Sequence, residues 1–272
     1  MTSDVPISVT TRFSFLGLSG WKSEPSRNPY LLFEEKRLAG RLYLFETVAL
    51  ASLAAQTDPD FHLHILTSDQ MPDWALERLH EISVAALGPH RVTIDAKPPG
   101  RARKFHRIYL QQAYGDQRIA QMVLDDDDGL SNDFMAILRE KIAVALDEGK
   151  LPDPGSRHFL SFPKGYGLVH SHGQTEIYRH TYELINLGLT MLGQPGKSIH
   201  SIVHQSGPVD IGYTAHADMP MFLRSVHHLN DSRVAVTHRW VKVDDWRAEP
   251  GFEERFGYVA PVIEGPPLHA QV

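Results

Sequence analysis

The first half of the chain alternates between two hydrophobic periods. Apolar and polar positions alternate over Ile7–Phe13 and again from Phe61 to Ile65, as they do in strands with one buried face. Between them an apolar residue recurs every three or four positions, which predicts a helix over about residues 31–55. Its buried stripe would consist of Leu38, Leu42, Phe45, Ala49 and Leu53.

The alternation continues to about residue 150. It predicts a helix containing Trp74, Leu79 and Ile82, a short strand at Val92–Ile94, a strand at Ile119–Leu124 and a helix at Phe134–Leu146. Strands and helices that alternate with short links are typical of βαβ units, so we expect an α/β fold with a mainly parallel sheet.

Such a sheet binds ligands beyond the carboxyl ends of its strands. This rule brings three polar segments to one rim: Thr11-Arg12, Thr67-Ser68-Asp69 and Asp125–Asp128. The second half is less regular. Residues 151–157 resemble a linker, residues 177–192 fit either a strand or a helix, and residues 220–229 favour a helix.

Composition excludes several classes of function. The 272 residues fit one large domain, or one with a smaller appendage, and the net charge of -6 argues against nucleic acid as the main partner. No cysteine is present, which excludes disulfides and thiolate metal sites. The chain has no signal-peptide pattern and no apolar run near the roughly 20 residues of a membrane span. We therefore expect a cytoplasmic protein, with at most peripheral membrane association.

The run Asp125-Asp126-Asp127-Asp128 directly follows an apolar strand. Two like charges 4 Å apart repel by about 1 kcal/mol in water and about 4 kcal/mol at a protein surface. A shared divalent cation removes this repulsion, and carboxylate oxygens suit Mn²⁺ or Mg²⁺. The alternative is a solvated acidic turn, or aspartates that cap the following helix.

A basic cluster lies roughly 20 residues before the acidic run, and consists of Arg101, Arg103, Lys104, His106 and Arg107. A diphosphate favours both a metal ion and protein cations, so the two clusters could serve one ligand. Arg101 and Lys104 would share one side of a helix. The alternative is a helix face that only meets water.

Together these segments resemble the rhamnosyltransferase family of bacterial glycosyltransferases, which has the GT-A fold. The resemblance is carried by five segments in this order: Thr11-Arg12-Phe13, Arg41–Gln56, Asp58-Pro59-Asp60-Phe61, Thr67–Pro72 and Leu124–Asp128. It covers about residues 5–140 well and the remainder weakly. It implies a GT-A-like unit, with a nucleotide-sugar-binding part at residues 1–150 and an acceptor-side part at residues 151–272 packed on the same sheet.

The resemblance also implies roles for residues at the rim. Asp125 and Asp127 would form the Asp-x-Asp pair that holds the metal, with Asp126 and Asp128 as an alternative register. Asp127 would be the direct metal ligand and catalytic, and Asp125 or Asp126 would face the ribose or the ion. Thr11 and Arg12 would lie near the nucleotide, and Asp69 near the base or ribose. The donor would be a nucleoside-diphosphate sugar, for instance one that carries rhamnose. The acceptor would be a glycan or another hydroxyl compound.

Many GT-A enzymes supply a late histidine as another metal ligand. Among the sixteen histidines, His238 is the first choice for this role and His216 the second. The tryptophan-led segment ending in a histidine and an asparagine, which such proteins often carry, is not recognisable. Its nearest match is His238-Arg239-Trp240.

An inverting transfer needs a base that takes the proton of the acceptor hydroxyl. Asp218 is the first choice, although it could equally cap the helix predicted after it. Asp210 and Glu176 are weaker alternatives. A retaining transfer would not need this base.

Two other classes of function stay open. A nucleotidyltransferase would also use paired carboxylates on a metal, but Arg12–Gly20 offers only Gly17 and Gly20 for a phosphate loop. A non-enzymatic cation-binding module of EF-hand type is only partly matched, because Glu140 lies four residues beyond the position that such a loop requires.

Overall fold

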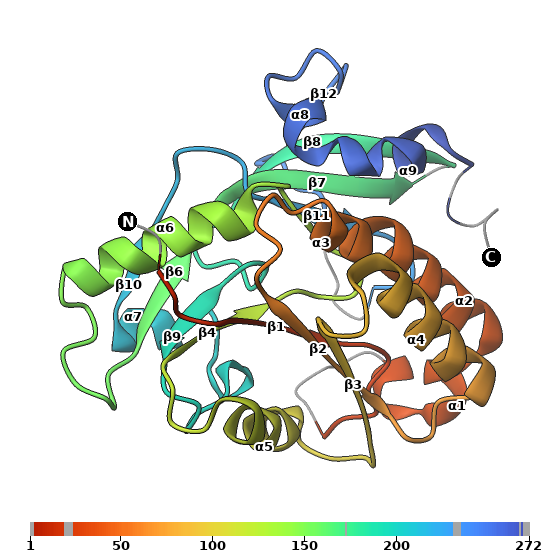
Figure 1. Cartoon of the computed structure of the whole chain (residues 1–272). Helices are drawn as coiled ribbons and strands as arrows, with labels where there is room; N and C mark the ends of the chain where they lie inside the picture. Colours follow the sequence, from red (N-terminus) through yellow and green to blue (C-terminus); the bar gives the residue numbers. More distant parts are fainter. Residues whose placement is uncertain (1–2, 19–23, 172, 231–234, 267, 269–272) are drawn as a thin grey trace.

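A seven-stranded mixed sheet forms the centre of the molecule (Figure 1). The computed structural model describes residues 3–18, 24–171, 173–230, 235–266 and 268. The strands lie in the order β10-β6-β9-β4-β1-β2-β3. Their bounds are β1 (Ile7–Arg12), β2 (His62–Ser68), β3 (Val92–Lys97), β4 (Ile119–Val123), β6 (His158–Ser161), β9 (Thr190–Gly193) and β10 (Tyr213–Ala215).

The sheet confirms the predicted α/β, GT-A-like architecture. Strands β4, β1, β2 and β3 pair in parallel, whereas β9 runs antiparallel to both β4 and β6. Strands β6, β9 and β10 all follow residue 150, so the second half of the chain completes the sheet that the first half begins.

Helices cover both faces of this sheet (Figure 1). One face packs on α2 (Glu35–Leu44), α3 (Ala51–Ala54), α4 (Asp73–Leu87) and α6 (Phe134–Asp147), through a core that includes Val9, Leu38, Leu79 and Leu138. The predicted helix over residues 31–55 is confirmed as α2, a π-helical segment Phe45–Leu50 and α3, preceded by the short α1 (Pro29–Leu32). The other face carries α5 (Ala102–Tyr114) and the 3₁₀ helix Ile199–Ser201.

A second sheet lies beside the first and has the strand order β12-β8-β7-β11-β5. Its strands are β5 (Gly129–Leu130), β7 (Lys164–Ser171), β8 (Gln174–Thr181), β11 (Phe222–Val226) and β12 (Val241–Val243). Helices α8 (Phe252–Phe256) and α9 (Ala260–Glu264) cover one face through a core that contains Tyr166, Leu168 and Leu223. The remaining helices are α7 (Gly207–Ile211) and the 3₁₀ turns Pro25–Arg27 and Gly257–Val259.

The helix predicted over residues 220–229 is wrong, because this segment contains strand β11. Phe222 and Leu223 pair with β7 on one side and with β5 on the other. The apolar run there is too short for its period to separate the two structures, and tertiary pairing decides between them. Residues 177–192, which the sequence left ambiguous, contain the end of β8 and most of β9.

The acidic run connects the two sheets. It follows β4 in the first sheet and leads directly into β5 in the second, so Asp125–Asp128 lie where the sheets meet. In the part of the chain that the structure describes, no helix has the length and apolar character of a membrane span.

Candidate active site

The acidic run forms a tight, buried turn at the carboxyl ends of β1 and β4. The Leu124 N–H donates to the carbonyl of Thr10 at 3.1 Å, and the Asp128 N–H donates to the carbonyl of Asp125 at 3.3 Å. Asp126, Asp127 and Asp128 are only 2%, 4% and 6% exposed, and Asp125 is half-buried. The alternative of a solvated acidic turn is therefore wrong.

Arg41 supplies a buried positive charge to this turn from helix α2. Its Nε donates to Asp126 Oδ2 at 3.1 Å, its Nη2 donates to the other oxygen of Asp126, and its Nη1 donates to Asp127 Oδ2 at 3.0 Å. One guanidinium thus bridges two adjacent aspartates. Arg41 therefore supplies part of the positive charge that the sequence predicts for a divalent ion.

Two residues after β11 complete the surroundings of Asp127. His227 Nε2 lies 2.9 Å and Asn230 Nδ2 2.8 Å from Asp127 Oδ2. The Leu229 N–H donates to His227 Nδ1 at 3.2 Å, so Nε2 carries the proton and donates to Asp127. Three donors therefore converge on Oδ2, which leaves Oδ1 as the oxygen of Asp127 for another cation.

The four carboxyl groups differ in proton affinity. Burial raises the pKa of Asp126 to about 7, although Arg41 opposes this shift. Burial acts on Asp127 too, but Arg41 and His227 bring its pKa below the ordinary value. Burial also raises the pKa of Asp125 and, more strongly, that of Asp128. Asp127 is thus the carboxylate that holds its negative charge most firmly.

Further cations surround Asp125. The guanidinium groups of Arg12, Arg41 and Arg224 each lower its pKa against the effect of burial. Arg12 ends β1, and Arg224 lies on β11 immediately before Ser225, whose N–H donates to Asp128 Oδ1 at 2.8 Å. The charge of Asp125 also acts on His204. Asp125 is therefore the half-exposed member of the run, and it lies among arginines from two sheets.

The donor set fits a divalent ion that substrate would complete. Asp125 and Asp127 Oδ1 offer oxygens, and His170 Nε2 is buried without a hydrogen-bond partner, with its ring 6.2 Å from that of His227. No group of three or more histidine or acidic residues within the described ranges is arranged to hold a metal by itself. Mg²⁺ and similar ions commonly bind one or two carboxylates and take their other ligands from phosphates and water.

Other predicted residues lie on the same rim but away from the acidic turn. Thr11 donates its hydroxyl to the Leu124 carbonyl at 2.8 Å, so this hydroxyl fixes the approach to the turn. Asp69 is exposed just after β2, where its N–H donates to the Lys97 carbonyl at 3.0 Å. Arg101 and Lys104 are exposed at the start of α5, and no described hydrogen bond or ion pair joins either side chain to the turn.

The structure does not bring Asp218 or His238 to the acidic turn by any described contact. Asp218 is exposed and lines a cavity of about 110 Å³ with His216, Phe162 and Met219. It cannot cap a helix, because the segment that follows it enters β11. His238 is exposed in the loop that leads to β12. Of the weaker bases, Asp210 is exposed on α7, and Glu176 accepts a hydrogen bond from Tyr178 at 2.9 Å.

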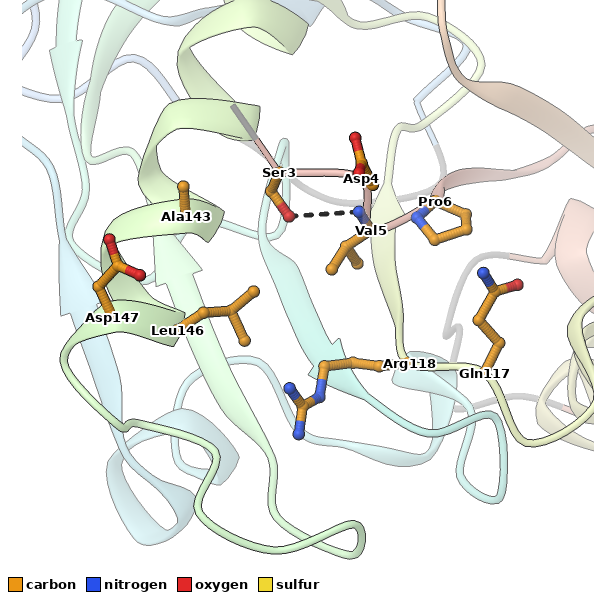
Figure 2. A pocket seen from close by; sticks show the side chains of 9 residues that line it. All are labelled: Ser3, Asp4, Val5, Pro6, Gln117, Arg118, Ala143, Leu146 and Asp147. Carbon is orange, nitrogen blue, oxygen red and sulfur yellow. Dashed lines mark hydrogen bonds between the residues drawn. The ribbon is translucent and has the colours of Figure 1, made fainter. Parts of the chain in front are cut away.

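A larger cavity lies at the opposite end of the strands. Its volume is about 440 Å³, and Figure 2 shows its lining at the amino ends of β1 and β4 and on α6. The residues are Ser3, Asp4, Val5, Pro6, Gln117, Arg118, Ala143, Leu146 and Asp147. None of the site residues predicted from the sequence lines this cavity, so cavity volume alone does not locate the candidate site.

Arg41, His227, Asn230 and Arg224 were not predicted from the sequence. A signal existed for the histidine and the asparagine, because His227–Asn230 directly follows a strand, but only once that segment is recognised as β11. Arg41 begins one of the segments that carry the resemblance, but its place on an amphipathic helix gave no sign that it would contact the acidic turn.

No curated protein sequence matches this chain. Similar solved structures include S. aureus TarS (14% identity, TM-score 0.42), S. aureus TarS 1–349 in complex with UDP (14%, 0.42) and S. aureus TarS 1–349 (13%, 0.40). They match over 82%, 82% and 81% of this chain, which spans 37%, 61% and 60% of theirs.

The sequence comparison assigns a family. A family model described as "Putative rhamnosyl transferase" matches residues 7–239, a range that includes the acidic turn, Arg41, His227 and Asn230. The chain therefore belongs to this family of glycosyltransferases.

Proposed function

We propose that this chain transfers a sugar from a nucleoside-diphosphate sugar to a hydroxyl acceptor, with Asp125–Asp128 at the centre of the donor site. Two points support the proposal: membership of the rhamnosyltransferase family, and one observation of the site. Asp125 is a half-exposed carboxylate at the carboxyl rim, beside an Asp127 held by three donors and among arginines from both sheets. Rhamnose is the donor sugar that the family description favours.

The transfer forms one bond and breaks another at the anomeric carbon. The acceptor oxygen bonds to that carbon while the bond between the carbon and the diphosphate oxygen breaks. The electron pair of the broken bond stays on the nucleoside diphosphate. The acceptor hydroxyl loses its proton to a base or to solvent. Negative charge therefore develops on the diphosphate, and the cations around Asp125 stabilise that charge.

We also propose that Asp125 and Asp127 hold Mn²⁺ or Mg²⁺. A bound divalent ion neutralises the diphosphate and stabilises the leaving group. The chain's own part is to keep Asp127 ionised and fixed, through Arg41, His227 and Asn230, and to leave Asp125 accessible. The roles of His238 as a metal ligand and of Asp218 as the base stay predictions, since neither makes a described contact with the turn.

A hydrolysis assay over a panel of nucleotide sugars, with Mn²⁺ or with EDTA, tests the proposal. We expect release of nucleoside diphosphate from at least one donor, with a loss of at least tenfold in EDTA. The variant Asp125→Asn should lose turnover and keep the melting temperature of the wild type. Release of pyrophosphate would instead indicate a nucleotidyltransferase, and no product from any donor would count against an enzyme of either class.

A further inference from the structure

Arg224 is a half-buried cation to which the described part of the chain offers no hydrogen-bond or ion-pair partner. It lies on β11 of the second sheet, directly before Ser225, whose N–H donates to Asp128 Oδ1. Its register partner on β7 is Gly167, which has no side chain to bond it. Within the residues that the structure describes, the Arg224 side chain makes no hydrogen bond and no ion pair. A guanidinium has five N–H donors, so leaving it half-buried and unpaired costs free energy.

Three of the four nearby carboxyl groups bond to other partners, and within the described ranges only Asp125 does not. Asp126 and Asp127 are bonded by Arg41, and Asp128 accepts from a backbone N–H. Arg224 directly precedes Ser225 on β11, and the Ser225 N–H donates to Asp128 Oδ1 at 2.8 Å, so Arg224 lies beside the acidic turn where the two sheets meet. The N–H donors of Arg224 are therefore available to a ligand that enters this rim.

The chemistry of that ligand follows from its surroundings. Arg12 ends β1 in the first sheet and Arg224 lies on β11 in the second, and the charge of each lowers the pKa of the half-exposed Asp125 against the effect of burial. Planar guanidinium groups bind phosphate oxygens through paired hydrogen bonds. A diphosphate carries more than one negative charge, so it could contact Arg224 and, at the same time, a cation bound to Asp125. A single carboxylate matches this arrangement less well.

We propose that Arg224 binds the diphosphate of the donor and stabilises the negative charge that develops as the nucleoside diphosphate leaves. This inference rests on the proposed function and deepens it, since it assigns the protein's own cation for the leaving group. It separates the roles of two arginines. Arg41 neutralises the acidic turn internally, and Arg224 acts on the substrate.

Titration calorimetry with UDP, dTDP and GDP in the presence of Mn²⁺ tests the inference on the full chain. For the diphosphate that wild type binds, we expect Arg224→Gln to weaken binding at least tenfold and Arg224→Lys to weaken it less. Binding of the matching monophosphate should change less than threefold. Arg78→Gln, which removes an exposed arginine of α4, is the matched control and should bind as wild type does.

Thermal unfolding distinguishes this role from a structural one. Because the Arg224 side chain bonds to no residue in the described ranges, Arg224→Gln should melt at the same temperature as wild type or higher. Diphosphate binding within twofold of wild type, or a large fall in melting temperature, would overturn the inference and leave the proposed function standing. If wild type bound none of the three diphosphates, both the inference about Arg224 and the proposed function would be overturned.

Discussion

Arg41 and Asp126 form a buried two-point ion pair. The Nε of Arg41 lies 3.1 Å from Asp126 Oδ2, its Nη2 donates to Oδ1, and both side chains are less than a tenth exposed. The same guanidinium also reaches Asp127. A single residue of α2 therefore holds two carboxylates of the acidic turn in place, and it does so before any substrate arrives.

Replacing Arg41 by methionine should strongly destabilise the protein. Removing one partner of a buried ion pair leaves an uncompensated charge and typically costs about 3–5 kcal/mol. Urea unfolding of Arg41→Met should show a loss of this size, whereas the control Arg78→Gln should change stability by less than about 0.5 kcal/mol. A second change, Asp126→Asn, should recover part of the loss in the Arg41→Met background. A loss below about 1 kcal/mol would contradict the structural role of Arg41.

Substitutions of Asp127 should separate charge from structure. From the sequence alone, Asp127→Ala is expected to abolish turnover and leave the fold intact. The structure changes the second expectation, because alanine leaves Arg41, His227 and Asn230 without their common acceptor. Both variants remove the carboxylate charge and should lose turnover. Asp127→Asn keeps one acceptor oxygen, so the alanine variant should be less stable than the asparagine variant by about 1–3 kcal/mol. Equal unfolding midpoints for the two variants would contradict this reading.

The strand-helix alternation and the rim were predictable because their signals are local. Hydrophobic period, caps and the carboxyl-end rule need only a few neighbouring residues, and they brought Thr11, Asp69 and Asp125 to one rim. The internal partners of the turn were not predictable in the same way. Arg41 lies 85 residues before Asp126, and Asn230 lies 103 residues after Asp127. No pattern in one sequence shows which distant charge a buried carboxylate will meet.

The second sheet shows a related limit. Strand β11 is stabilised by pairing with β7 and β5. Because it is short, the spacing of its apolar residues does not distinguish a helix from a strand. Reading this segment as a helix concealed Arg224 on the strand and His227 and Asn230 after it. The resemblance implies a late histidine, for which the sequence favours His238, and the structure leaves His238 exposed.

A layer of buried histidines should make the protein less stable in acid. His106 Nδ1 lies 2.8 Å from Ser198 Oγ, and His200 Nε2 lies 3.1 Å from Thr10 Oγ1, between the first sheet and α5. Burial sets the pKa of each histidine well below the ordinary value. The charged forms of His200 and His64 lower the pKa of His106 further. Arg12 and the charged form of His64 do the same for His200. The unfolded chain then binds more protons than the folded one below about pH 6.5.

Stability carried by these histidines is thus present above pH 6.5 and is lost as the pH falls below it. Each contributes up to about 1.4 kcal/mol per pH unit. Asp126 and Asp128, whose pKa values are raised, act in the opposite direction, so the useful measurement is a difference between proteins. The free energy of unfolding in urea should fall less steeply from pH 6.5 to 5.5 in His106→Asn than in wild type. Identical slopes would show that His106 is not buried in its neutral form.

The packing of Trp240 on Gly167 links the second sheet to the site. A Cβ at Gly167 would overlap the Trp240 ring, which also stacks on His180 with ring centroids 4.1 Å apart. Overpacking of this kind costs about 1–3 kcal/mol, so Gly167→Ala should lower stability by that amount. Gly155→Ala is the matched control, because a Cβ there meets nothing within 4 Å, and it should be neutral or slightly stabilising. Gly167 is the register partner of Arg224, so displacement of Trp240 should also lower turnover. Unchanged stability and unchanged near-ultraviolet circular dichroism in Gly167→Ala would show that Trp240 can leave this position freely.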